Sequence, residues 1–176
     1  MDKSKQTILL EEMDILFDKF VNCKAYFPYL AENNVGAREF ETGRLYASLG
    51  YDIKFGFNKP MTLDNLNKHN ELSHWLNQNF IIRLYSLMES YKYKYPFDGK
   101  IDGYEEVNIL RKLRDIFAHS SDKYNEDKEK QKTMLLEVVK HFKLEEQNPD
   151  HIPLPIDKVI IPMFNKCKIY INNKVN

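Results

Sequence analysis

Arg114 and His119, with Asp115 directly after the arginine, are the residues of this chain whose types and spacing could do chemistry. An arginine is a permanent cation whose planar fork of donors can hold a phosphate, whereas a histidine can give or take a proton near neutral pH. Cleavage of RNA without a metal ion requires both functions. Each residue alone is ordinary near the end of a helix, so the hypothesis depends on the pair.

The helix that carries this pair sets a geometric condition. At about 100° per residue, positions 114 and 119 are about 140° apart around an ideal α-helix and flank its apolar stripe on opposite sides. One regular helix therefore does not bring the two side chains together. Either the chain unwinds at Ser120 and Ser121 and turns the imidazole round, or a second copy of the helix supplies the complementary residue across a two-fold axis.

Apolar residues spaced three and four apart predict the helices that position the pair. The third helix is the clearest, because Leu110, Leu113 and Phe117 share one face with their neighbours. The second is one long helix or two abutting ones, with Thr62 as its N-cap. The expected fold is all-α, an up-and-down bundle of four to five main helices in a single domain over residues 1–176. The predicted helices span residues 6–29, 63–95, 103–119 and 126–144.

Two segments have no clear periodicity. Residues 31–60 are punctuated by glycines and form an irregular insertion between the first and second helices, in which residues 50–57 could be a short strand, a hairpin arm or a packed loop. Residues 149–176 form a C-terminal extension with helical spacing from Ile156 onward. Pro162 would kink or restart that helix, and residues 166–169 alternate as a strand would. Helix is the preferred interpretation of the extension.

Composition excludes several classes of protein. Twenty-six Lys and Arg balance 26 Asp and Glu, so any contact with RNA must be local, since no global positive charge exists to hold nucleic acid. Cys23 and Cys167 are too few for a disulfide framework and favour a reducing compartment. Acidic residues interrupt the apolar run near the N-terminus, and no stretch approaches the roughly 18 uncharged residues of a membrane span. A soluble, cytoplasmic protein without membrane contact is expected.

The motif and its setting resemble those of a known superfamily. Arg114, the polar Asp115, three further residues and His119 follow the R-polar-x-x-x-H signature of HEPN domains, and the surrounding string ILRKLRDIFAHSSD is close to the usual form. HEPN domains are compact helical bundles, commonly dimeric. Many are metal-independent endoribonucleases of toxin-antitoxin, abortive-infection and other phage-defence systems, whereas others have lost the motif and act as binding modules. One branch carries a tyrosine two residues after the histidine, where this chain has Ser121.

The resemblance implies a mechanism and a set of site residues. A ribose 2′-hydroxyl would attack the adjacent phosphate and leave a cyclic phosphate, with His119 as general acid or base, Arg114 stabilising the charge on the phosphoryl oxygens and Asp115 orienting one of them. Neighbouring residues would contact the substrate. No cofactor and no metal are implied, and the expected partners are RNA, a second copy of the chain and an antitoxin protein. The candidate substrate-binding residues are Arg111, Lys112, Ser120 and Lys123.

Other interpretations stand beside the catalytic one. Arg111 and Asp115 are four residues apart and would form an ordinary helix-surface ion pair. His69 and His74 have no metal-ligand spacing, so a zinc site is not expected. The alternating tyrosines and lysines of residues 91–95 could stack on RNA bases, although such a run is more often a helix end. The alternative function is a non-catalytic HEPN-like module that binds a nucleotide or a protein partner.

Overall fold

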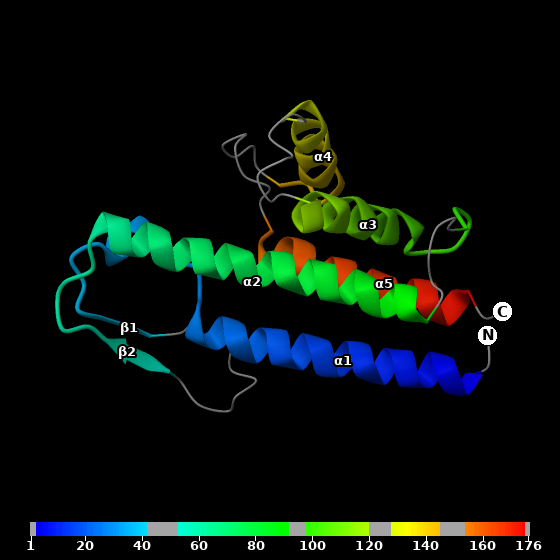
Figure 1. Ribbon diagram of the computed structural model, residues 1–176, viewed down its shortest axis with the longest axis horizontal. Helices are drawn as coiled ribbons and strands as arrows, with labels where there is room; N and C mark the ends of the chain where they lie inside the picture. The colour runs from blue at the N-terminus through cyan, green and yellow to red at the C-terminus, as the bar shows by residue number, and fades with distance from the viewer. Residues whose placement is uncertain (1–2, 42–52, 92–97, 120–127, 145–153, 175–176) are drawn as a thin grey trace. The chain divides into compact units, whose positions relative to one another are not determined.

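The computed structural model describes residues 3–41, 53–91, 98–119, 128–144 and 154–174 (Figure 1). Within these residues the chain is predominantly helical with one small sheet, which confirms the predicted all-α class. The α-helices are α1 (Lys3–Tyr26), α2 (Leu63–Ser90), α3 (Tyr104–His119), α4 (Lys128–His141) and α5 (Ile161–Asn173). The shorter elements are the 3₁₀ turn η1 (Glu32–Asn34), the strands β1 (Glu39–Glu41) and β2 (Lys54–Gly56), and the π-helical turn η4 (Ile156–Ile160). Among the described residues, no helix combines the length and the apolar character that crossing a bilayer requires.

The described residues divide between two compact units. The first comprises residues 1–12 and 81–176, and the second comprises residues 13–80, so α1 and α2 each contribute to both. We refer to them as the α3–α5 unit and the hairpin unit.

In the hairpin unit, α1 and α2 pack as an antiparallel pair. Phe20 stacks on Phe80 with ring centroids 4.4 Å apart, and Lys24, one turn later in α1, contacts Ser73, two turns earlier in α2. Thr62 caps α2 as predicted, because its Oγ accepts a hydrogen bond of 3.2 Å from the backbone N–H of Asn65.

The segment between α1 and α2 contains a two-stranded antiparallel sheet. Phe40 in β1 lies opposite Phe55 in β2, and their rings stack at 4.7 Å. Phe40 belongs to a small core of buried apolar side chains, against which Phe55 and Phe57 pack. Of the three alternatives for residues 50–57, the short strand is confirmed at residues 54–56, and this strand is also one arm of an antiparallel pair with β1. The core consists of Leu30, Phe40, Met61 and Leu66.

In the α3–α5 unit, the C-terminal extension is helical. Pro162 stands in the first turn of α5, directly after the π-helical turn η4. The proline thus restarts a helix, one of the two predicted outcomes. Residues 166–169 lie inside α5, so the strand interpretation is wrong. The face of α5 that is buried includes Met163, Cys167, Tyr170 and Ile171.

Candidate functional site

The motif lies on α3, and the start of α3 is fixed by its close approach to α5. Gly103 has a φ of +88°, and a Cβ at this position would lie 2.2 Å from the carbonyl oxygen of Lys166. Only glycine fits, because other residues disfavour this backbone conformation and the space is already filled. The Nζ of Lys166 also bonds Asp102 at 2.8 Å. From this anchor, the fully buried Leu110 and Leu113 turn the polar side of α3 outward.

Arg114 has three contacts within the α3–α5 unit. Its Nη1 donates a 2.8 Å hydrogen bond to Oδ1 of Asp115, its Nη2 lies 3.6 Å from Oε2 of Glu89, and its guanidinium lies 5.5 Å from the centre of the Tyr85 ring. The hydrogen bond to Asp115, followed by the charges of Asp115 and Glu89, raises the pKa of Arg114 further above its ordinary value. With 29% of its side chain exposed, Arg114 is a permanent cation that remains accessible to a phosphate.

Asp115 is shared between two arginines. Besides its bond to Arg114, its Oδ2 lies 3.8 Å from Nη1 of Arg111, which confirms the ion pair predicted from the four-residue spacing. Arg111 also donates from Nη2 to Oδ1 of Asn108 at 3.3 Å. The structure therefore brings together Arg111, Arg114 and Asp115, three of the predicted site residues.

Lys112 lies apart from this group. Its Nζ is 2.7 Å from both carboxylate oxygens of Glu137 in α4. A second link joins the same helices, because Nε2 of His141 in α4 lies 3.1 Å from Oε1 of Glu106 in α3. Lys112 therefore holds α4 on α3. A substrate phosphate would have to compete with Glu137 for the Lys112 ammonium group.

His119 is the last residue of α3. Since the backbone is helical from Tyr104 to His119, the Arg114 and His119 positions keep the separation of about 140° of a regular helix, with an axial rise of about 7.5 Å. The structure does not describe the side chain of His119, nor the residues Ser120, Ser121 and Lys123. The predicted unwinding of the chain after the helix therefore lies outside the described residues.

Comparison with protein-family models, curated proteins and solved structures found no match for this chain. Within the described ranges, no group of three or more His, Cys, Asp or Glu side chains could hold a metal ion. His69 instead contacts the carbonyl oxygen of Pro28 at 2.9 Å, and His74 packs against the ring of Tyr29.

Sequence reasoning missed the partners of the basic side chains. Tyr85 and Glu89 beside Arg114, and Glu137 beside Lys112, come from other helices, so no local spacing could reveal them. In the aromatic and basic run of residues 91–95, Tyr91 is half-buried and hydrogen-bonds Glu12, whereas residues 92–95 lie outside the described residues. Nothing in the described part of that run supports contact with RNA.

Proposed function

We propose that this chain is an endoribonuclease of the HEPN type, which cleaves RNA without a metal ion. One observation carries the proposal: the Arg-polar-x-x-x-His motif closes an amphipathic helix in an all-α chain, with the guanidinium of Arg114 partly exposed beside Asp115. Arg111 adds a second positive charge to the same group. We further propose that the protein acts in the cytoplasm as a toxin or phage-defence effector, with an antitoxin protein as its partner.

In the proposed reaction, the 2′-oxygen of a ribose attacks the adjacent phosphorus and the bond to the 5′-oxygen of the next nucleotide breaks. One imidazole removes the proton of the 2′-hydroxyl, and a second group returns a proton to the leaving oxygen. The products are a 2′,3′-cyclic phosphate and a 5′-hydroxyl. Arg114 stabilises the negative charge that grows on the phosphoryl oxygens, and Asp115 holds its fork in place.

The helical geometry of α3 favours a site shared between two copies of the chain. Positions 114 and 119 of one regular helix face away from each other, whereas a two-fold axis can place Arg114 of one copy beside His119 of the other. The dimer would then hold two equivalent sites, each pairing Arg114 of one copy with His119 of the other. We therefore propose a homodimer as the active form.

The test is cleavage of single-stranded RNA by the purified chain in excess chelator. Wild-type protein should release fragments ending in a cyclic phosphate, and His119→Ala and Arg114→Ala should each lower the rate at least about 100-fold, the scale of a lost acid–base or oxyanion-stabilising group. Arg38→Ala, which removes an exposed arginine of the hairpin unit, is the matched control and should retain full activity. Equal cleavage by His119→Ala would contradict the proposal.

A second candidate function is a non-catalytic module that binds a nucleotide or a protein partner. It is favoured by the contacts of Arg114, whose guanidinium already has two carboxylates and a ring from its own chain. In that case Arg114 is a structural residue. RNA cleavage would be absent, and Arg114→Ala would lower the stability of the fold or of the dimer instead.

A further inference from the structure

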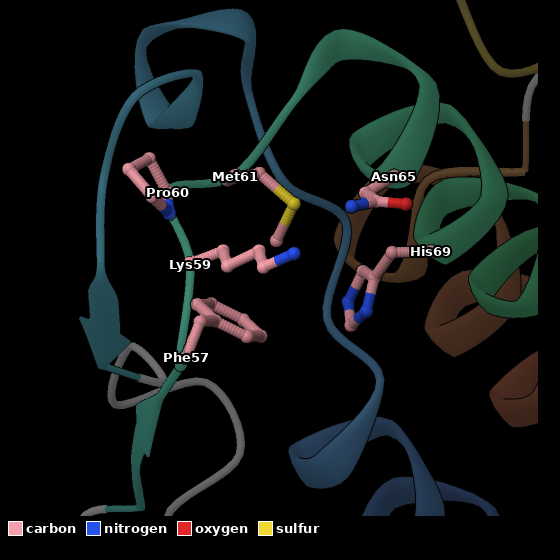
Figure 2. A pocket seen from close by; sticks show the side chains of 6 residues that line it. All are labelled: Phe57, Lys59, Pro60, Met61, Asn65 and His69. Atoms are coloured by element: carbon pink, nitrogen blue, oxygen red, sulfur yellow. The ribbon is translucent and has the colours of Figure 1, made fainter.

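The hairpin unit contains a small hollow between the segment that follows β2 and the first turns of α2. Its volume is about 190 Å³, and six side chains line it (Figure 2). A hollow of this size suits a small ligand with one ring system and a short substituent. The lining residues are Phe57, Lys59, Pro60 and Met61 before α2, and Asn65 and His69 within it.

One side of the hollow is apolar and firmly held. Met61 is almost fully buried, and its backbone N–H and C=O bond Ala37 and Gly36, each at 2.8 Å. The ring of Phe57 packs against Phe40 with centroids 5.6 Å apart. These contacts fix the wall before any ligand arrives, and an aromatic face with a thioether beside it favours a flat ring.

His69 supplies a hydrogen-bond acceptor. Its Nε2 lies 2.9 Å from the carbonyl oxygen of Pro28, and a carbonyl can only accept, so the proton of the neutral ring is on Nε2 and Nδ1 carries a lone pair. Burial, and then the positive charge of Lys24, lower the pKa of His69 below its ordinary value, against the opposing effect of the Pro28 bond. His69 is therefore neutral at physiological pH.

Lys59 and Asn65 complete the polar side. Lys59 extends from the segment before α2 toward the side on which Asn65 and His69 lie (Figure 2). Whereas Lys54, Lys68, Lys112 and Lys166 each pair with a carboxylate, neither Lys59 nor the Asn65 side chain has an ion pair or hydrogen bond within the part of the chain that the structure describes. A cation, an amide and a ring nitrogen thus border one hollow with an aromatic wall, the composition of a small-molecule site.

We propose that this pocket binds a small aromatic carboxylate whose ring carries an N–H or O–H group. The carboxylate pairs with Lys59, the ring packs on Phe57 and Met61, and the ring donor bonds the Asn65 amide beside His69. All of these residues belong to the hairpin unit, so the site does not depend on the proposed ribonuclease activity.

The test is a titration of the full chain, followed by the NMR signals of the Met61 methyl group and the His69 ring. The probes are 2-aminobenzoate and its neutral counterpart 2-aminobenzamide. The acid should bind saturably and about tenfold more tightly than the amide, the effect of one charge-assisted hydrogen bond. Lys59→Gln should abolish this preference, and Asn65→Leu should weaken binding of the acid about threefold to tenfold.

Lys68→Gln is the matched control, because Lys68 is an exposed lysine of α2 outside the pocket. It should bind both probes as the wild type does. The substituted side chains are exposed, and equal melting temperatures will show that the variants are folded. The proposal is overturned if neither signal shifts saturably, if Lys59→Gln keeps the preference for the acid, or if adenosine monophosphate binds more tightly than 2-aminobenzoate.

Discussion

The guanidinium of Arg114 donates a 2.8 Å hydrogen bond to the carboxylate of its neighbour Asp115, and the other oxygen of that carboxylate lies 3.8 Å from Arg111. One acidic residue thus holds two cations on the exposed side of α3. Asp115 could have either of two roles: it could position Arg114, or it could take part in the chemistry itself. If it only positions Arg114, its loss should affect catalysis less than loss of the arginine itself.

Asp115→Asn should therefore lower the rate of RNA cleavage by about tenfold at most, well short of the loss in Arg114→Ala. The stability of the fold should fall by less than about 1 kcal/mol, because nearly half of the Asp115 side chain is exposed. Cleavage rates and denaturant titrations of the two variants check both expectations. A loss as large as that in Arg114→Ala would place Asp115 in the chemistry itself.

Gly103→Ala should destabilise the protein by about 2–4 kcal/mol, because a side chain is strained at this φ and the new methyl group collides with backbone of α5. Gly99→Ala is the control, since its Cβ would meet only the Tyr104 ring at an ordinary 3.7 Å, and its effect should stay within about 1 kcal/mol. Urea unfolding measures both. Equal effects would show that the approach of α3 to α5 does not require glycine.

Lys24→Met should stabilise the protein at pH 7 by about 1–3 kcal/mol. Lys24 is 1% exposed, and burial lowers its pKa to about 8. Between pH 8 and the unfolded pKa near 10.4, the unfolded chain holds this proton more firmly, so wild-type stability rises with pH by up to about 1.4 kcal/mol per unit. Below pH 8 the buried charge lowers the free energy of unfolding by its full amount, and the hydrogen bonds that Lys24 donates to Ser73 offset part of this loss.

The difference in stability between Lys24→Met and the wild type should accordingly shrink as pH rises from 8 to 10.4. Thermal unfolding across this window gives the measurement, and Lys19→Met, at an exposed position of the same helix, should show no such trend. A difference independent of pH would mean that the Lys24 amine is not a buried titrating group.

Lys112 and Glu137 should be energetically coupled by about 0.5–1 kcal/mol, because their ion pair is about two-thirds buried and joins α3 to α4. Lys112→Gln and Glu137→Gln alone should each lower stability by about this amount, and the double variant should lose little more than either. A double-mutant cycle by urea unfolding tests this. Additive losses would show that the pair contributes nothing as a pair.

The helices and the local contacts of the site could be predicted from the sequence because both depend on short spacings. The apolar period of α3, the Thr62 cap, the restart at Pro162 and the Arg111–Asp115 pair all involve residues within one or two turns. Lys24 was also open to prediction, since it follows Phe20 by four residues on the buried stripe of α1.

The remaining features depend on residues that are distant in the sequence. β1 and β2 have only three residues each, so they are too short to show a sequence periodicity. They are held together by the ring contact between Phe40 and Phe55, which are distant in the sequence. Glu89 beside Arg114 is a further case, because it comes from the end of another helix. For the same reason, no single sequence can place His119 of one copy near Arg114 of another, because that relation belongs to an assembly.

Mixing two inactive variants tests this relation most directly. If Arg114 and His119 of different copies share one site, Arg114→Ala and His119→Ala, each inactive alone, should recover about a quarter of wild-type RNA cleavage after mixing and subunit exchange. Half of the dimers are then mixed, and each mixed dimer holds one complete site of two. No recovery, although native mass spectrometry shows mixed dimers, would contradict the shared site. Cleavage by either variant alone at the wild-type rate would contradict the proposed chemistry.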